Sequence, residues 1–317
     1  MTLRGFRMFV LIASTAWLLP AQTSQINGPV SGYVFDAAAH SLRPILGLPG
    51  ASLFGDPLQF GFTVASAFVT PHQDAAFVVG ADGTLHLFRI DAGAVTERNV
   101  ESLPPAPQRV VFSPSGTAAA VFAGGSIAVV KGLPDTPGVA GGMDLPAGTP
   151  LDSLAISDDG AVLLLSANQA VRYFSSFTDL GKLMDTSGAV LMAFAGGGHD
   201  AAIADPSGVG IVLFHDLTGS GDSQVLAAAD DTVGAASALT FAPDGKRLLV
   251  ASSRAQSVTI FDLAAGGRSA IACDCSPKVL TRMGGLFRLN DLGSEPLWLL
   301  DTHASEARLV FVPALAQ

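Results

Sequence analysis

The sequence predicts an all-β protein, a single β-propeller with seven blades of about four antiparallel strands. Three observations predict it. Short apolar runs separated by turns recur about every 40 to 46 residues, a repeat length typical of propeller blades. Seven of these runs have the pattern of a third blade strand. Among 317 residues, 35 are Gly and 19 are Pro, which favours many tight turns over long helices.

Residues 239–262 form the most regular copy of the repeat, and they read LTFAPDGKRLLVASSRAQSVTIFD. An apolar strand leads into a Pro-Asp-Gly turn, and a second apolar strand follows at once. After a polar loop comes a third strand that ends at Asp262. The other copies are degraded versions of this order.

The third strands are the most regular elements along the chain. Each is a short run of β-branched or aromatic residues closed by a polar residue, as expected for a strand that enters a turn. The runs end at Asp36, Asp91, Lys131, Ser175, Asp216, Asp262 and Asp301.

A first strand, a turn and a second strand recur six times. Several of the turns carry Pro early and Gly late; Pro fixes φ, and Gly accepts a positive φ. Alanines in the following second strands indicate crowded positions near a central axis. The first strands with their turns cover residues 67–74, 110–116, 154–160, 191–200, 239–245 and, less regularly, 279–285, and each second strand follows directly.

The stretch 22–66 contains a third-strand match but no recognisable first or second strand. A ring leaves its terminal blades unpaired unless the two ends of the chain meet. We therefore expect the N-terminal strands to complete the ring beside the C-terminal strand at 308–313. Six blades plus an N-terminal hairpin is the alternative. No linker divides residues 22–317, which we predict to be one propeller domain.

Residues 1–21 have the layout of a signal peptide. Arg4 and Arg7 precede an apolar run at 8–19, and the small residue Ala21 follows Pro20. The run is shorter than the roughly twenty residues that span a bilayer, so an uncleaved anchor is the less favoured alternative. We expect a bacterial protein exported to the periplasm or the medium, with no membrane attachment after cleavage.

The repeat at 239–262 resembles the YVTN-type and WD-repeat-like propellers of bacteria, in which a Pro-Asp-Gly turn precedes a valine-rich strand ending in Asp. The Trp-Asp dipeptide of WD repeats is absent, since Leu299 follows Trp298, and LLVAS at 248–252 replaces the YVTN tetrapeptide. Some relatives of such propellers are lactonases and others are binding or structural proteins, so the resemblance implies the fold and leaves the activity open.

Five of the third strands end in Asp, which raises two hypotheses. Carboxylates at strand ends are ligands for a hard cation such as Ca²⁺. Equivalent positions in different blades lie on a circle, however, and a short acid at a strand end accepts hydrogen bonds from turn amides. We interpret Asp36, Asp91, Asp216, Asp262 and Asp301 as turn-capping acids and expect no cofactor, with a divalent cation as the alternative.

Cys273 and Cys275 are the two cysteines of the chain. In an exported protein, two nearby thiols favour oxidation to a disulfide, which would here close a very small ring. A packed pair of thiols, a redox pair and a metal site are alternatives. The usual redox spacing of two intervening residues is absent, and no histidine lies nearby in sequence to complete a metal site.

Six histidines occur, and none has the spacing of a local metal motif. His72 and His199 both fall in predicted turns between first and second strands, which lie on one face of a propeller. They are candidates for one functional surface there, although loop histidines are usually only solvated.

No nucleophile motif and no phosphate-binding glycine loop is visible. A net charge of −10 without basic clusters argues against a nucleic-acid partner. The sequence favours a monomeric, non-catalytic scaffold that binds a protein or a small polar ligand through one face of the ring. The alternative is a lactonase-like hydrolase with its site in the central channel.

Overall fold

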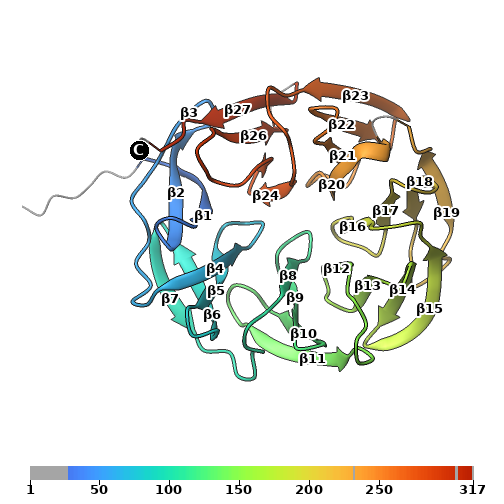
Figure 1. Ribbon diagram of the computed structural model, residues 1–317, viewed down its shortest axis with the longest axis horizontal. Coiled ribbons are helices and arrows are strands. Elements are labelled where there is room, and N and C mark those ends of the chain that lie inside the picture. Colours follow the sequence, from blue (N-terminus) through green and yellow to red (C-terminus); the bar gives the residue numbers. More distant parts are fainter. Residues whose placement is uncertain (1–27, 231–232, 304–305, 316–317) are drawn as a thin grey trace, which may run out of the picture.

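Seven antiparallel sheets stand around a central axis in the computed structural model, which describes residues 28–230, 233–303 and 306–315 (Figure 1). The predicted seven-bladed propeller is confirmed. The signal peptide predicted at 1–21 lies outside the described residues. Within them, one short 3-10 helix, Val233–Ala235, is the sole helical element, and no helix is long and apolar enough to cross a membrane.

The blades follow chain order, and neighbouring strands in each blade are neighbours in sequence. Blade 1 comprises β1 (Val30–Asp36), β2 (Ser41–Leu48) and β3 (Ala51–Phe54). Blade 2 comprises β4 (Val64–Val69), β5 (Ala75–Gly80), β6 (Leu85–Asp91) and β7 (Ala94–Arg98). Blade 3 comprises β8 (Arg109–Phe112), β9 (Ala118–Ala123), β10 (Ser126–Lys131) and β11 (Gly138–Asp144). Blade 4 comprises β12 (Ser153–Ile156), β13 (Val162–Ala167), β14 (Ala170–Ser175) and β15 (Thr178–Asp185).

The last three blades repeat this order. Blade 5 comprises β16 (Leu191–Phe194), β17 (Ala201–Asp205), β18 (Gly210–Phe214) and β19 (Ser223–Ala227). Blade 6 comprises β20 (Ala236–Phe241), β21 (Arg247–Ser252), β22 (Ser257–Asp262) and β23 (Gly267–Ala272). Blade 7 comprises β24 (Thr281–Met283), β25 (Leu286–Arg288), β26 (Leu297–Asp301) and β27 (Arg308–Val312).

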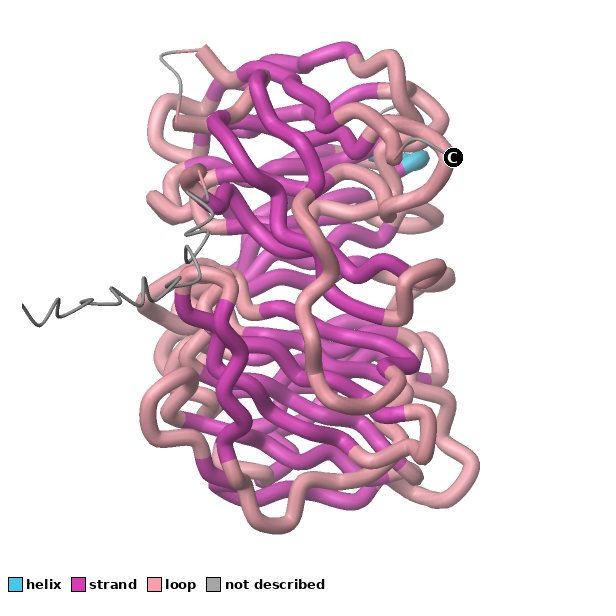
Figure 2. Tube along the Cα trace, turned by 90° about the vertical axis from the view of Figure 1, so that its left-hand side faces the viewer, coloured by secondary structure: helices cyan, strands magenta, loops and turns pink. Residues whose placement is uncertain are grey.

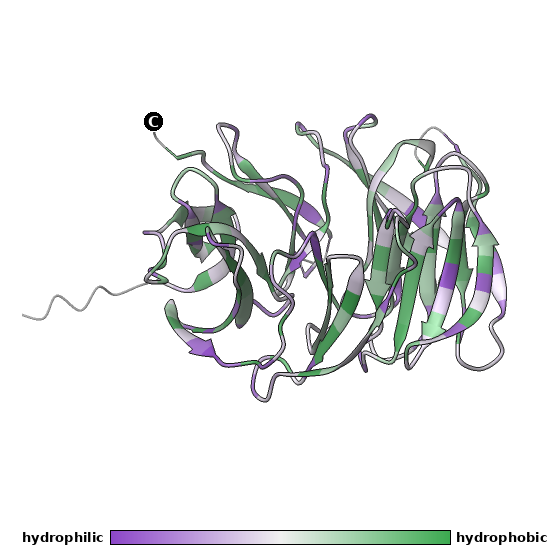
Figure 3. Ribbon diagram, turned by 60° about the horizontal axis from the view of Figure 1, so that its bottom comes forward, coloured by the Kyte–Doolittle hydropathy of each residue, from purple (hydrophilic) through white to green (hydrophobic). Residues whose placement is uncertain are grey.

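Burial explains why the inner strands carry small and apolar residues. Every residue of β5 and of β18 is buried, and three consecutive alanines in β9 are at most 1% exposed. Side chains from adjacent blades share each core cluster, so small residues let the sheets approach closely. In the outermost strand β11, exposed residues alternate with half-buried ones, and most residues of the outermost strand β15 are exposed. Figure 3 shows hydrophilic residues on the outer strands and loops.

The loops gather at the two faces of the ring, which Figure 2 shows from the side. One face carries the turns between the first and second strands of the blades, and we call it the turn face. The Pro-Asp-Gly turn of blade 6 is typical: Gly245 has a φ of 66°, and its N–H donates to the carbonyl of Ala242 at 2.9 Å. A side chain at Gly245 would be strained, because L residues rarely adopt this backbone conformation.

Blade 1 departs from the sequence-based prediction. The segment that ends at Asp36 was expected to be a third strand, yet it is β1, an end strand of its sheet and the one nearest the centre (Figure 1). The hydrophobic alternation of a first strand and of a third strand is the same, so the pattern does not distinguish them. As expected, the N-terminal strands complete the ring beside the C-terminal strand, with β3 next to β27.

The closure between blades 7, 1 and 2 depends on Gln73. Its Oε1 accepts the backbone N–H of Tyr33 in β1 at 2.7 Å, and its Nε2 donates to the carbonyls of Thr70 at 2.9 Å and of Arg282 at 3.5 Å. The N–H of Gly284 in blade 7 also donates directly to the carbonyl of Pro71 in blade 2, at 2.7 Å. At the turn face, blades 7 and 2 therefore touch past blade 1.

Candidate central site

A cavity of about 590 Å³ occupies the middle of the ring on the turn face. The first strands and first turns of blades 2 to 7 line it, and no residue of blade 1 does. Most of the lining residues have apolar side chains. The lining residues with polar side chains are His72, Ser113, Ser115, Asp158, Thr240, Thr281 and Arg282. The site is therefore assembled from single residues of different blades.

Arg282 supplies the positive charge of the cavity. It lies on β24, and its guanidinium donates from Nε to the carbonyl of Gly284 at 3.0 Å and from Nη1 to that of Pro114 at 2.9 Å. Burial lowers the pKa of Arg282, and the nearby charge of Asp158 acts in the opposite direction. No partner for Nη2 occurs among the described residues, so this nitrogen is available to a ligand.

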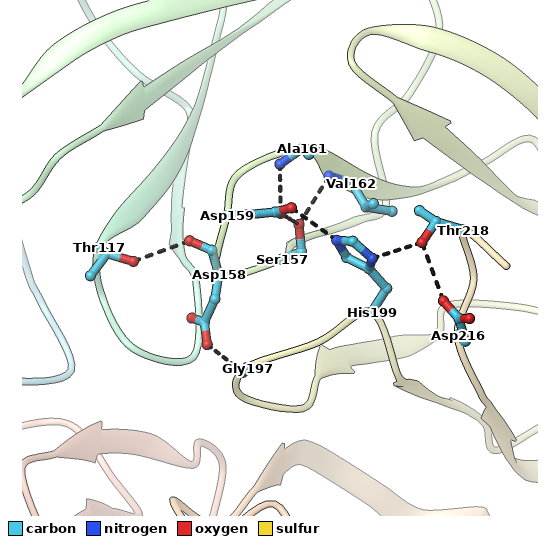
Figure 4. A network of polar contacts seen from close by, with 10 residues as sticks. All are labelled: Thr117, Ser157, Asp158, Asp159, Ala161, Val162, Gly197, His199, Asp216 and Thr218. Carbon is cyan, nitrogen blue, oxygen red and sulfur yellow. Dashed lines mark hydrogen bonds and ion pairs between the residues drawn. The ribbon is translucent and has the colours of Figure 1, made fainter.

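Asp158 supplies the negative charge, but its carboxylate is already engaged (Figure 4). Oδ1 accepts the backbone N–H of Ser115 at 2.6 Å, and Oδ2 accepts that of Gly197 at 2.8 Å. Thr117 donates its hydroxyl proton to the carbonyl oxygen of the same residue at 3.1 Å. Asp158 thus joins the first turns of blades 3, 4 and 5 around the mouth of the cavity.

His72 lines the cavity from the first turn of blade 2, and its two neighbours in sequence contact the backbone of blade 7. Its neighbour Pro71 is bonded to Gly284, and its neighbour Gln73 is bonded to Arg282. The imidazole is exposed, and within the described part of the chain no hydrogen bond to it is recorded. His72 also borders a second pocket of about 400 Å³, between blades 1 and 2.

His199 is on the same face but outside the cavity lining. Its Nε2 lies 3.0 Å from Oδ2 of Asp159, and its Nδ1 lies 2.8 Å from the hydroxyl of Thr218, which donates to Asp216 at 3.2 Å (Figure 4). Burial raises the pKa of Asp159, but hydrogen bonds from Ser157, the backbone of Ala161 and His199 outweigh it, so the net pKa is lowered. The structure does not bring His199 and His72 into one polar cluster.

The five repeated acids lie at turns, with unequal roles. Asp262 accepts the backbone N–H groups of Ala264 and Ala265 at 3.0 and 2.8 Å, and Asp36 accepts those of Ala38 and Ala39 at 2.9 and 3.1 Å. Asp301 accepts the N–H of His303 at 3.0 Å and pairs with Arg308, whereas Asp216 accepts the Thr218 hydroxyl. No such bond of the Asp91 side chain is recorded among the described residues.

Cys273 and Cys275 are joined in a disulfide, and both are buried in the core between blades 6 and 7. The bond follows β23 and precedes β24, in the connection between these blades. It lies among apolar side chains such as Leu249 and Phe287, and neither cysteine lines the central cavity.

Within the residues that the structure describes, no three His, Cys, Asp or Glu side chains lie together in an arrangement suited to a metal ion. The central site offers another combination: a guanidinium with one free nitrogen, an imidazole and a bonded carboxylate. In enzymes generally, a guanidinium stabilises developing negative charge on an oxygen, and an imidazole accepts or donates a proton.

Sequence reasoning missed Arg282 and Asp158. Asp158 falls in the first turn of blade 4 and was treated as turn chemistry, whereas Arg282 lies in the least regular copy of the repeat. One residue from each of several blades leaves no local motif. The one signal in the sequence that could have identified Arg282 is its charge, since the predicted first strands consist mostly of apolar residues.

No family model matches the sequence, and no curated protein matches it. Solved structures do match the fold. A 6-phosphogluconolactonase candidate from Bacteroides fragilis has a TM-score of 0.59 and 14% identity, over 90% of this chain and 94% of that one. A periplasmic gluconolactonase of Pseudomonas aeruginosa has a TM-score of 0.59 and 16% identity, over 91% and 97%. A protein of unknown function from Desulfotomaculum acetoxidans has 0.59 and 13%, over 90% and 100%.

At these identities the likeness shows a shared propeller fold, and no match supports the finer YVTN-type or WD-repeat-like naming. The likeness also corrects the main functional interpretation made from the sequence. The scaffold was favoured because few charged or histidine residues were expected near the axis. The names of two similar structures, a 6-phosphogluconolactonase candidate and a gluconolactonase, contradict that interpretation, and Arg282, Asp158 and His72 all line the central cavity.

Proposed function

We propose that the protein hydrolyses a small lactone in the central cavity. The observation that carries the proposal is the position of Arg282, a guanidinium held at the wall of the cavity that His72 also lines, with no hydrogen bond of its Nη2 among the described residues. The lactonase names of two structures with the same fold support it. A fold alone hosts many activities, so the argument depends on the site.

Lactone hydrolysis requires a water molecule to attack the ring carbonyl, and negative charge then develops on its oxygen. Arg282 is suited to stabilise that charge, because its other nitrogens are fixed by the carbonyls of Gly284 and Pro114 and little reorganisation is needed. His72 is suited to take the proton of the attacking water and to return it to the ring oxygen as the C–O bond breaks. The product is the open hydroxy acid.

Asp158 has a positioning role in this scheme. Both of its oxygens accept backbone N–H groups, which leaves it poorly placed to act as the base. Its negative charge raises the pKa of the nearby Arg282 guanidinium and so favours the charged form. Substitution of Asp158 should therefore disturb the mouth of the cavity rather than remove the chemistry.

We also propose that the protein acts outside the cytoplasm. The signal-peptide layout at 1–21 supports this, as does the periplasmic gluconolactonase among the similar structures. Mature protein that begins near Gln22 in a periplasmic or culture fraction is the expected result, and N-terminal sequencing checks it.

Hydrolysis of a panel of lactones by the purified protein, followed as acid release, tests the proposed activity. His72→Gln should lower kcat by roughly 10² or more, the usual contribution of a general base, and Arg282→Gln should lower kcat/KM by roughly 10²–10³. His215→Gln, at an exposed histidine away from the cavity, is the control and should keep full activity. Absence of any lactone hydrolysis, or full activity in both site variants, would overturn the proposal.

A further inference from the structure

We propose that His199 is a positioning residue for the central site, and that its two side-chain hydrogen bonds hold the first turn of blade 5 in place as part of the cavity wall. This turn, which we call the glycine turn, comprises residues 195–200 and reads AGGGHD. Gly196 and Gly197 line the central cavity, whereas His199 does not. The kinetic consequence of this role rests on the proposed function, since it concerns ligand binding at the same site.

The equivalent turns of four other blades are closed from within. In blades 2, 3, 4 and 6, a backbone N–H donates to the carbonyl oxygen three residues earlier, at 2.9 Å in each case. The donors are Gln73, Gly116, Gly160 and Gly245. In blades 2 to 4, a hydroxyl at the start of the turn also accepts the backbone N–H of the residue five positions later. These hydroxyls belong to Thr70, Ser113 and Ser157.

The glycine turn has neither of these bonds. The N–H of Ala195 donates to the carbonyl of Asp200 at 2.8 Å, but among the described residues no backbone bond closes the turn across three residues. Ala195 stands where blades 2 to 4 have Thr or Ser, so the hydroxyl is missing too. Three consecutive glycines follow, and Gly197 has a φ of 79°. Because glycine restricts the backbone least, the conformation of this turn depends on contacts from outside it.

Those outside contacts come from blade 4 and from the loop after β18 (Figure 4). The N–H of Gly197 donates to Oδ2 of Asp158 at 2.8 Å. The Nε2 of His199 lies 3.0 Å from Oδ2 of the next residue, Asp159, and its Nδ1 lies 2.8 Å from the hydroxyl of Thr218. Blade 4 therefore holds the glycine turn at two points, and His199 provides the only side-chain contact of the two.

Asp159 is a firm anchor for this imidazole. Its Oδ1 accepts the hydroxyl proton of Ser157 at 2.6 Å and the backbone N–H of Ala161 at 2.9 Å. Ser157 is fully buried, so the carboxylate is tied to the core of blade 4. A carboxylate that is fixed in this way cannot follow a displaced turn, and the place of the glycine turn is set by the His199 side chain.

The glycine turn affects the site through Asp158 and the cavity wall. If the turn moves, Oδ2 of Asp158 loses its donor and the wall formed by Gly196 and Gly197 moves with it. Arg282 and His72 belong to blades 7 and 2, and among the described residues no hydrogen bond joins them to the turn. Loss of His199 should therefore weaken ligand binding more than the chemical step, so that KM rises while kcat is kept.

The test compares His199→Ala, which removes both bonds, with His199→Gln, which keeps an N–H donor for Asp159. In His199→Ala we expect the amide hydrogen of Gly197 to exchange with solvent roughly tenfold faster, and KM for a hydrolysed lactone to rise roughly three- to tenfold with kcat within about twofold. His199→Gln should show smaller changes in both. Nuclear magnetic resonance and steady-state kinetics measure them.

His86→Ala is the matched control. His86 pairs with Glu97 at 2.7 Å, and its side chain is 24% exposed, against 23% for His199. It lies on β6, and neither the Gly197 exchange nor KM should change when it is replaced. Circular dichroism and the Tm of each variant confirm that it is folded.

The outcomes separate the two proposals. Unchanged exchange at Gly197 in a folded His199→Ala protein, or the same change in His86→Ala, would overturn the positioning role and leave the lactonase function in place. A loss in kcat as large as that in kcat/KM would also overturn it. A wild type that hydrolyses no lactone would overturn the proposed function, and the exchange of Gly197 would then decide the positioning role by itself.

Discussion

Blade 6 and blade 1 show how differently the same ring is built in two places. Blade 6 has four strands of six residues, with continuous pairing from β21 through β23 and a Pro-Asp-Gly turn with a positive-φ Gly245. Blade 1 has three strands, lacks the outermost one, and contributes nothing to the cavity wall. The regular blades supply most of the apolar lining residues of the cavity, whereas Arg282 comes from blade 7, next to the ring closure. The candidate site residue Arg282 therefore lies in the copy where the sequence repeat is least regular.

The largest expected effect comes from filling the space at Gly32 in β1. A Cβ built there would collide with Cε of the buried Met283 and would lie 3.2 Å from Oε1 of Gln73. Gly32→Val should lower the free energy of unfolding by roughly 1–3 kcal/mol, because overpacking forces its neighbours to move. Gly188→Val, where the nearest atom is 3.5 Å away, is the control. Equal Tm values for the two variants would show that the closure is not tightly packed.

Removal of the Gln73 side chain tests the closure directly. Gln73→Ala leaves the N–H of the buried Tyr33 without its acceptor, which should cost roughly 1–3 kcal/mol. We also expect a fall in lactonase activity beyond that of Gln59→Ala, an exposed control, since Gln73 adjoins His72 and contacts Arg282. Urea unfolding and steady-state kinetics measure the two effects; wild-type values in both would contradict this role.

The repeated acids offer a smaller effect within the regular blades. Asp262→Ala removes an acceptor of two turn amides and should cost roughly 0.5–2 kcal/mol, by analogy with helix caps. Asp91→Ala should stay within about 0.5 kcal/mol, the range of an ordinary surface substitution. A larger loss of stability in Asp91→Ala than in Asp262→Ala would contradict the turn-capping role of Asp262.

The smallest expected effect is a dependence on pH. Burial raises the pKa of Asp36, but hydrogen bonds from Arg43 and from the backbone of Ala39 and Ala38 outweigh it, so the pKa is lowered. Because the folded pKa lies below the unfolded value of about 3.9, the stabilisation is complete above that value and is lost as pH falls through the folded pKa.

Asp36→Asn should therefore be less stable than the wild type at neutral pH, and the difference should shrink as the pH falls below about 4. The same substitution at the exposed Asp56 should leave the pH dependence of the wild type intact. Urea midpoints measured from pH 7 downward check both. A difference between Asp36→Asn and wild type that grows toward acid pH would contradict the sign.

The fold could be predicted from the sequence because its signal is local and repeated. Turns such as the one containing Gly245 mark a blade wherever they occur, and each blade contributed one strand match, six of them true third strands and the seventh, ending at Asp36, a first strand. The place of the segment ending at Asp36 could not be predicted, since its alternation suits a first strand equally well. The approach of Arg282 to the first turn of blade 2 depends on a contact between Gln73 and Arg282, which are 209 positions apart, and no local pattern contains it.

The direct hydrogen bond between Gly284 and Pro71 has a geometric consequence for the whole ring. Seven blades form the outer rim of the ring, but only blades 2 to 7 line the opening on the turn face. Blade 1 stands between blades 7 and 2 without lining that opening. The opening of the cavity on this face is therefore bounded by six blades. A single hydrogen bond that skips a blade closes this boundary between blades 7 and 2.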